Sequence, residues 1–355
     1  MANRRFLITG GRVWTGETFT EGDVAVSGGK VLSIGAHEGF EPEAVFDAAG
    51  KIVVPGLVDI HTHFAGIGSE SFGISADLAT IPYGVTAAAD ASAAYGSREL
   101  LDSFAVRNVV FLDSGIRNDH ADFTRADRML SVYGDKAIGV KMYFDVNVTE
   151  CRTVQPVREV CHYAQEHGLI VMVHCSNSPV PMREILETLR PGDILTHSYH
   201  GGVHTSMDDG FESLKAARER GVVIDSGHAG YVHTNFKVLR EAVRNGAQPD
   251  TISTDITRLS IGTRGGNYGL TLCMSLMRSL GMSEEDVLRA VTSTPAKALG
   301  QPWGRLEAGG TADIAVLDYT NEPFCLTDPE GNTAQGNMGY RCLLTLKGGE
   351  VLFRR

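Results

Sequence analysis

The chain divides into three stretches by the spacing of its hydrophobic and polar residues. Over residues 5–50, short hydrophobic runs alternate with glycine pairs, a pattern typical of short antiparallel strands joined by hairpins. From Val53 to about residue 299, longer hydrophobic runs alternate with amphipathic stretches. After Pro302 the short-strand pattern returns, at 314–317, 343–346 and 351–353.

The middle stretch predicts an α/β fold. Strands that alternate with helices imply parallel crossovers and a (β/α)8 TIM barrel. An open doubly wound sheet is the alternative, and we prefer the barrel because eight strands are present and polar residues follow them throughout. The predicted strands are 53–60, 84–90, 107–113, 137–143, 168–174, 193–197, 221–226 and 250–255, and the predicted helices are 154–167, 181–190, 208–220, 235–246 and 283–299.

The two terminal segments predict a second, smaller unit. Each is too short to bury a core by itself. We therefore expect residues 1–52 and 301–355 to pair in one composite β-sandwich domain, beside a barrel domain of residues 53–300.

Composition narrows the class of protein. The chain has 355 residues, of which 43% are hydrophobic and 21% charged, as in a soluble globular protein. Its net charge of −11 argues against a nucleic-acid partner. No hydrophobic run is long enough to predict a membrane span or a secretory signal. The six cysteines include no CxxC pair, which predicts a reduced, cytoplasmic protein. The oligomeric state, a homo-oligomer included, stays open.

Two histidines follow the first strand of the barrel. The buried run that begins at Val53 ends in His61-Thr62-His63. Side chains alternate along a strand, so His61 and His63 point to the same side. Two imidazoles on one face can hold one metal ion together.

Further polar residues occur at the ends of later strands. Lys141 lies in the fourth strand, His174 ends the fifth, His197 the sixth and Asp255 the eighth. Each alone has an ordinary explanation as a core histidine, a helix cap or a lysine that reaches solvent. Active sites of barrels lie at the carboxyl ends of the strands, and these separate places along the chain agree on that one face.

The residue types predict two divalent metal ions. Imidazole and carboxylate ligands suit Zn2+, with Mn2+ as an alternative. Two cations close together need an anionic bridge besides hydroxide. Burial favours the neutral amine of a lysine, and a neutral amine that adds CO2 becomes a carbamate with two oxygens. We therefore predict a carbamate on Lys141 as the bridge.

This set of residues resembles the amidohydrolase superfamily, in the binuclear branch that includes dihydroorotases, hydantoinases and N-acyl amino acid deacetylases. The similarity runs from about residue 5 to the end. The motifs that carry it are 55–63, Lys141, His174, His197, Asp255, 294–300, 304–306, Gly309 and 312–314. Within the branch, residues 191–197, 225–228 and 252–256 are similar to a dihydroorotase-like deacetylase subgroup.

The resemblance implies a hydrolase that cleaves an amide carbon–nitrogen bond, or an ester bond, of a small molecule through a metal-bridging hydroxide. In the superfamily pattern, His61 and His63 bind the more buried cation with Asp255. His174 and His197 bind the more exposed cation, and carboxylated Lys141 bridges the two. Asp255 is also the catalytic residue, which takes a proton from the hydroxide and gives it to the leaving group.

Substrate contacts are less constrained by the sequence. Arg258 and Arg264 follow the eighth strand and are candidates to hold a substrate carboxylate. His228 follows the seventh strand and Tyr143 follows Lys141, so both are candidates to contact substrate. Solvated arginines, a structural histidine and a packing tyrosine are the ordinary alternatives. The roles of His200, His204 and His233 stay open, with the loop surface as their expected place.

Three other functions remain as alternatives. The first is a cyclic-amide hydrolase of the hydantoinase or dihydropyrimidinase type. The second is a mononuclear deaminase, which normally lacks the strand-four lysine and carries a glutamate near the strand-six histidine, whereas residues 195–205 contain none. The third is a non-catalytic scaffold, although every ligand position is filled. Segment 197–204 is richer in histidine than the subgroup, and Tyr143 stands near a position where some relatives carry arginine, so the substrate stays open.

Overall fold

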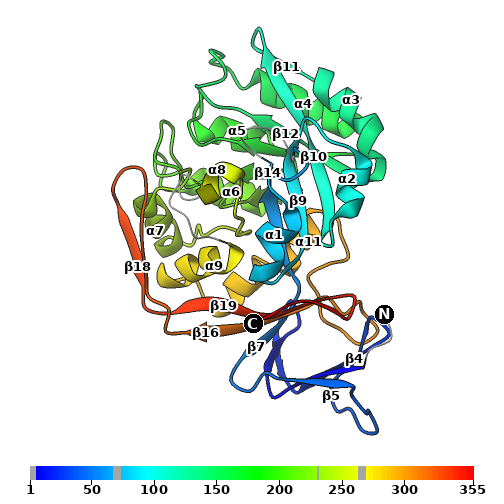
Figure 1. Ribbon diagram of the computed structural model, residues 1–355. Helices are drawn as coiled ribbons and strands as arrows, with labels where there is room; N and C mark the ends of the chain where they lie inside the picture. Colours follow the sequence, from blue (N-terminus) through cyan, green and yellow to red (C-terminus); the bar gives the residue numbers. More distant parts are fainter. Residues whose placement is uncertain (1–4, 67–72, 230–231, 263–268) are drawn as a thin grey trace.

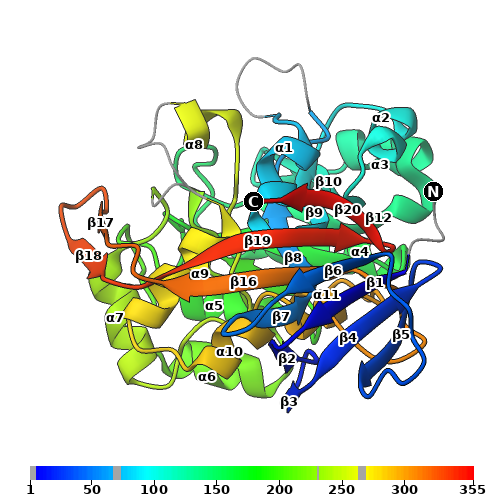
Figure 2. The same ribbon diagram turned by 60° about the horizontal axis from the view of Figure 1, so that its bottom comes forward.

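The structure is a computed structural model that describes residues 5–66, 73–229, 232–262 and 269–355. Its larger part is a parallel sheet surrounded by helices, and its smaller part is built of two further sheets (Figure 1). Figure 2 shows strands from both ends of the chain side by side in this smaller part.

The parallel sheet curls into a barrel, as the sequence predicts. Its strands follow one another in chain order, from β8 (Leu57–Thr62), β9 (Val85–Ala93), β10 (Arg107–Arg117) and β12 (Ala137–Tyr143) to β13 (Ile170–His174), β14 (Ile194–Thr196) and β15 (Val223–Ile224). The short β11 (His120–Asp122) pairs with the end of β10. Segment 250–256 takes the place of the eighth strand, because Thr251 bridges Asp225 after β15 and Ile256 bridges Thr62 of β8.

The strands of the barrel alternate between two environments. Val173 of β13 and Leu195 of β14 pack in one hydrophobic cluster with helix residues such as Val160. Met172 and Ile194 lie in a second cluster with Phe111 from β10. Two residues after Met172 along the same strand comes His174. The period of two therefore carries functional side chains to the inner face of the barrel.

Helices cover the outside of the barrel (Figure 1). Four predicted helices are confirmed, with ends a few residues shorter, as α4 (Gln155–Glu166), α5 (Met182–Thr188), α6 (Glu212–Glu219) and α7 (Phe236–Arg244). The sequence did not predict α1 (Ala76–Thr80), α2 (Arg98–Ser103), α3 (Thr124–Tyr133), α8 (Arg258–Gly262) and α9 (Leu270–Ser279).

The single helix predicted over 283–299 is wrong. The structure has α10 (Glu284–Arg289) and α11 (Ser293–Ala298), separated at Thr292, whose φ of −130° and ψ of −92° are not helical. Pro295 lies in the first turn of α11. A proline is tolerated there because the first helical N–H groups have no partner within the helix.

The first predicted strand, 53–60, divides into two strands in different sheets. β7 (Ile52–Pro55) pairs with strands of the smaller part, and β8 begins the barrel at Leu57. Gly56 stands between them, and a Cβ there would clash with Thr86. Close packing of two strands at this point requires glycine, so the chain passes from one sheet to the other at a single residue.

The smaller part joins the two ends of the chain. One sheet has the order β5-β4-β1-β6 and a second has the order β20-β19-β16-β7-β2-β3, so N- and C-terminal strands share the second sheet. The domain bounds given above stay a prediction. The strands are β1 (Phe6–Thr9), β2 (Arg12–Trp14), β3 (Phe19–Glu21), β4 (Asp23–Ser27), β5 (Lys30–Gly35), β6 (Ala44–Asp47), β16 (Ile314–Thr320), β19 (Gly339–Lys347) and β20 (Glu350–Arg354), with a separate hairpin of β17 (Phe324–Thr327) and β18 (Thr333–Gly336).

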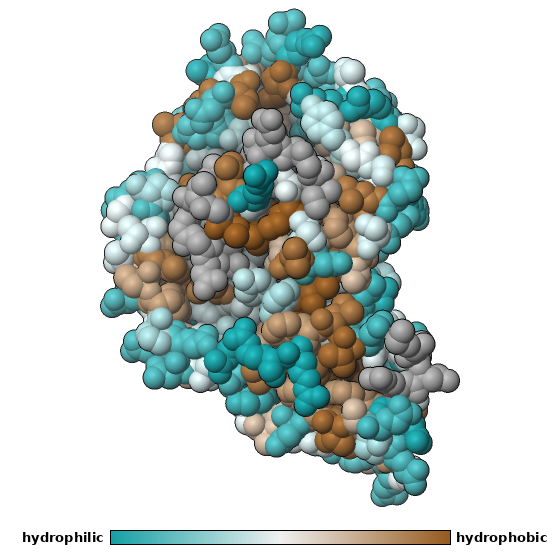
Figure 3. All heavy atoms as spheres, in the orientation of Figure 1, coloured by the Kyte–Doolittle hydropathy of each residue, from teal (hydrophilic) through white to brown (hydrophobic). Residues whose placement is uncertain are grey.

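Hydrophilic residues cover most of the outline in Figure 3, and hydrophobic residues gather toward the middle of that face. In the described part of the chain, the helices are too short or too polar to cross a bilayer. All six cysteines are free thiols, of which Cys325 is exposed and the other five are buried.

Trp14 of β2 connects the smaller part to the barrel. Its side chain is fully buried in the same cluster as Leu57 and Val85 of the barrel. Its Nε1 donates to Oγ1 of Thr292, between α10 and α11, at 3.2 Å. One indole therefore fills the junction and supplies a hydrogen bond across it.

We predict that Trp14→Ala lowers the free energy of unfolding by about 3–5 kcal/mol, because it leaves a large cavity at the junction. Urea unfolding monitored by circular dichroism measures the effect. Leu32→Ala is the control, since Leu32 is 55% exposed and its truncation should change the free energy by less than about 0.5 kcal/mol. A loss below about 1 kcal/mol for Trp14→Ala would contradict this role of the indole.

Candidate metal centre

A cavity of about 500 Å3 lies at the carboxyl ends of the barrel strands. All six residues predicted as metal ligands line it, namely His61, His63, Lys141, His174, His197 and Asp255. They come from β8, β12, β13, the end of β14 and segment 250–256. Residues separated by almost two hundred positions therefore meet in one space.

His61, Lys141 and Asp255 are buried and lie in contact with one another in the cavity. Nζ of Lys141 lies 2.9 Å from Nε2 of His61, and Oδ1 of Asp255 lies 3.2 Å from the same nitrogen. Nε2 of His63 lies 2.8 Å from Oδ1 of Asp255. One carboxylate oxygen is therefore shared by the two histidines of the HxH motif.

The hydrogen bonds behind His61 determine which of its nitrogens carries the proton. Thr196 donates its hydroxyl to Oδ2 of Asp225 at 2.7 Å. The Thr196 oxygen therefore accepts from Nδ1 of His61, at 2.9 Å. Nε2 of neutral His61 is then a lone pair that faces Asp255. Thr251 and Ser253 also donate to Asp225, at 2.7 and 2.8 Å.

His174 and His197 are held in the same manner. Nδ1 of His197 donates to the carbonyl of Gly227 at 2.7 Å. Ser176 donates to Asp145 at 3.2 Å and accepts from Nε2 of His174 at 2.6 Å. The other nitrogen of each ring therefore carries a lone pair and no proton. These nitrogens are Nε2 of His197 and Nδ1 of His174. Nε2 of His197 is buried and has no hydrogen-bond partner among the described residues.

Two of the predicted metal ligands have left-handed backbone conformations. His197 has a φ of 63° and Asp255 a φ of 47°. Strand alternation alone would turn His197 away, because Thr196 already takes the inward position of β14. The positive φ of His197 turns its side chain toward the cavity instead. Residues without glycine's freedom reach this conformation at a cost of roughly 1–2 kcal/mol, which the surrounding contacts must offset.

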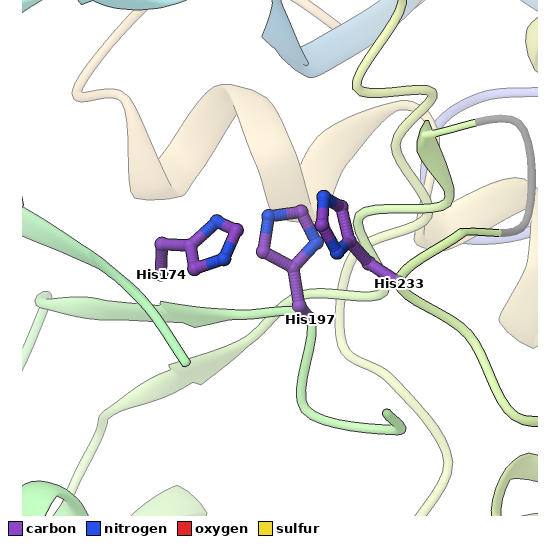
Figure 4. Close-up of side chains that lie close together, drawn as sticks. All are labelled: His174, His197 and His233. Atoms are coloured by element: carbon purple, nitrogen blue, oxygen red, sulfur yellow. The ribbon is translucent and has the colours of Figure 1, made fainter. Parts of the chain in front are cut away.

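His233 is a third imidazole beside His174 and His197. Their rings point toward one another in Figure 4, with ring centroids 4.9 Å and 4.4 Å from that of His233. The three ligand nitrogens lie close enough to hold one metal ion, as do those of His61 and His197 with Asp255. The expectation that His233 lies on the loop surface is wrong. The sequence offered no period to place it, because it belongs to the segment between β15 and α7.

Burial keeps His61, His174 and His197 neutral. It lowers the pKa of His61 to about 4, with a further contribution from Lys141. It also holds the pKa of His174 and of His197 well below the usual range. Burial would raise the pKa of Asp255, but the neighbouring His61 and His63 hold it well below its usual range. Neutral imidazoles beside an ionised carboxylate are the forms that bind a divalent cation.

Burial also lowers the pKa of Lys141 to about 8, although nearby carboxylates oppose the shift. Lys141 is 3% exposed, and its amine is therefore neutral more often than that of a lysine on the surface.

These groups fit a metal pair. Lone pairs of His61, His174 and His197 converge with an ionised carboxylate, and acceptors that face one another repel unless a cation lies between them. The lone pair of His61 and Oδ1 of Asp255 are two such acceptors, at 3.2 Å.

The predicted substrate contacts lie in different places. Tyr143 lines the cavity, and its ring centroid lies 3.9 Å from that of His174. His228 is buried with Nδ1 3.2 Å from Oγ1 of Thr234, and it is not among the described residues that line the cavity. Arg258 is exposed at the start of α8 and is likewise absent from that lining. Arg264 lies outside the described residues.

Comparison with known proteins agrees with this geometry. A model of the Amidohydrolase family matches residues 52–340, and the chain therefore belongs to that family. A deacetylase of Agrobacterium fabrum is 29% identical over 93% of this chain and 86% of its own length. A solved dihydroorotase superposes with a TM-score of 0.86 at 26% identity, over 98% of this chain and 99% of that chain. The predicted class of enzyme, a metal-dependent amidohydrolase, is confirmed.

An adenine deaminase structure also superposes, with a TM-score of 0.85 over 99% of this chain and 100% of that chain. Its sequence identity is 22%, so the likeness concerns the fold alone.

We predict that His228 makes the metal-free protein less stable as the pH falls. Burial lowers its pKa from 6.5 to about 4 in the folded chain, so between these values the unfolded chain binds a proton that the folded chain does not. The stabilisation is complete above pH 6.5 and is lost as the pH falls toward 4. The expected slope is about 1.4 kcal/mol per pH unit.

Urea unfolding in the presence of a chelator, from pH 4.5 to 8, tests this prediction when wild type is compared with His228→Gln. In the acidic range, the free energy of unfolding of the variant should fall less steeply with decreasing pH than that of wild type, by the contribution of one proton. Above pH 7 the two curves should run parallel. Parallel curves over the whole range would show that His228 is not held neutral.

Proposed function

We propose that this chain hydrolyses the amide bond of a small N-acyl compound with two divalent cations, Zn2+ or alternatively Mn2+. His61, His63 and Asp255 would hold one cation, and His174 and His197 the other, with His233 beside them. Lys141, as its carbamate, would bridge the two. The main support comes from one observation. Each ring of His61, His174 and His197 uses one nitrogen in a hydrogen bond to the protein behind it, so the lone pair of its other nitrogen points into one cavity.

Divalent cations in this set would make bound water a nucleophile at neutral pH and polarise the carbonyl of the substrate. Asp255 is the residue suited to move the proton. Its carboxylate stays ionised in a buried position, next to Nε2 of His63. Oδ2 lies on the side of His197, 3.7 Å from Nε2 of that ring. From there it can accept a proton in the cavity and donate it to the departing nitrogen.

The deacetylase relative supports an N-acyl substrate, and the dihydroorotase structure supports a cyclic amide as the alternative. A cavity of about 500 Å3 is of the size that takes small molecules. Ester hydrolysis would use the same groups, and we include it in the proposal as a second activity of the same site. The deaminase alternative lacks support from the residues, because 195–205 contains no glutamate and Lys141 is present.

The free cysteines agree with a reduced cytoplasmic location. That location and a homo-oligomeric state stay predictions.

We predict that Lys141→Ala loses both metal ions and hydrolytic rate, because the bridging anion is gone. Wild type loaded with Zn2+ and bicarbonate should contain about two metals per chain by elemental analysis. With 13C-labelled bicarbonate, wild type should show a carbamate signal by NMR that Lys141→Ala lacks. Rates come from a panel of N-acyl amino acids, acyl-hydroxy acids, hydantoins and dihydropyrimidines.

Lys215→Ala is the matched control, because Lys215 pairs with Glu212 on the surface of α6. It should keep metal content, the carbamate signal and rate. If Lys141→Ala retained both metals and its rate, the bridging role would be excluded. One metal per chain in wild type would favour the deaminase alternative.

A further inference from the structure

The cavity contains a guanidinium group that the metal chemistry does not use. Arg125, in the first turn of α3, lines the cavity together with Asp113 of β10. Its Nη1 donates to Oδ2 of Asp113 at 2.8 Å. Oδ1 of the same carboxylate accepts from the hydroxyl of Ser92 at 3.0 Å. Asp113 is thus held on both oxygens and fixes Arg125 in place.

The exposure of this ion pair is uneven. The side chain of Asp113 is 13% exposed and that of Arg125 is 55% exposed. The bond to Asp113 is the one hydrogen bond that the described residues give the Arg125 side chain. A guanidinium has five N–H donors in a planar fork, so Asp113 anchors one of them while the side chain that carries the others is about half exposed.

The other charged groups of the cavity wall already have contacts or proposed roles. Asp90 accepts from the backbone N–H groups of Ala65 and Ser92 at 2.7 and 3.0 Å, and also from that of Phe64. Asp255 and Lys141 belong to the proposed metal centre. Among the described residues that line the cavity, Arg125 is therefore the cation best placed to receive an anion from solvent.

Arg125 also stands where two hollows meet. A second hollow of about 520 Å3 shares Asp113, Arg125 and Tyr143 with the metal cavity, and it also contains Arg117. A ligand that reaches from the metal centre toward this junction meets Tyr143 and the guanidinium, because both line the two hollows. The far end of such a ligand enters a hollow lined by two arginines, each of which is paired with one carboxylate, Arg117 with Asp122 and Arg125 with Asp113.

We propose that Arg125 binds the carboxylate of the substrate through paired hydrogen bonds, which makes the substrate an acyl derivative of an amino acid or hydroxy acid. This inference rests on the proposed function and names its substrate class. Planar guanidinium and carboxylate groups match in a fork, and this geometry selects carboxylates over neutral amides. Hydantoins and dihydropyrimidines without a carboxylate are then poor substrates.

Matched pairs of ligands test the proposal, beginning with N-acetylleucine and the neutral N-acetylleucinamide. Calorimetry with the Zn2+-loaded full chain measures binding, and initial rates measure kcat/KM. Wild type should bind the acid at least about 10-fold more tightly than the amide. Arg125→Gln should weaken binding of the acid by about 10–100-fold, chiefly in KM, and leave the amide within about 2-fold. Arg125→Lys should recover part of the difference, because charge remains but the fork is lost.

Arg183→Gln is the matched control, since Arg183 is a surface arginine on α5 that pairs with one carboxylate, Glu187. It should leave acid and amide unchanged. Equal binding of acid and amide to wild type, or an equal loss for both in Arg125→Gln, would overturn the proposal and leave the ion pair with Asp113 a structural role. Two bound metals without hydrolysis of any ligand would refute the proposed function separately, because the difference in binding does not require turnover.

Discussion

The hydrogen bonds that close the barrel also assemble the candidate metal centre. Asp255 donates its backbone N–H to the carbonyl of His61 at 2.7 Å, and His63 donates to the carbonyl of Ile256 at 3.1 Å. Thr254 donates its backbone N–H and its hydroxyl to the buried carboxylate of Asp59, at 3.1 and 2.6 Å. These bonds fix the first strand against segment 250–256. Three of the proposed ligands therefore reach their places only when the ring of strands is complete, and burial that raises the pKa of Asp59 to about 7 is a cost of this arrangement.

Strand periodicity accounts for the part of the centre that the sequence could predict. Lys141 and His174 follow the period of two on β12 and β13. The alternation of strands and helices predicts that the strand ends, and with them the proposed metal ligands, lie at one end of a barrel. His197 and Asp255 line the cavity, as their positions after strands predict. Their side chains reach it only because both residues have a positive φ, which no hydrophobic pattern reveals. The division of the first strand at Gly56 was equally hidden, since it depends on contact with Thr86 from another strand.

The second layer of hydrogen bonds was also beyond the sequence. Thr196, Ser176 and Asp225 are common residue types, and only the tertiary structure shows that they set the tautomers of His61 and His174. His233 comes from the connection between β15 and α7, which carries no regular period, and Arg125 comes from the first turn of α3, a helix that the sequence did not predict. The proposed metal ligands lie at or just after strand ends, and the proposed substrate contact Arg125 lies in the segment that follows β10 and β11, as is usual for enzymes built on this barrel.

The central claim is that imidazoles from three segments, a carboxylate and a modified lysine surround a pair of cations. The most direct measurement is a crystal structure of the protein grown with Zn2+ and bicarbonate, with anomalous data collected above and below the zinc edge. The account predicts two anomalous peaks about 3.5–4 Å apart, with continuous density from Nζ of Lys141 to a carbamate between them. A single peak, or an unmodified Lys141 that does not reach either metal, would contradict it.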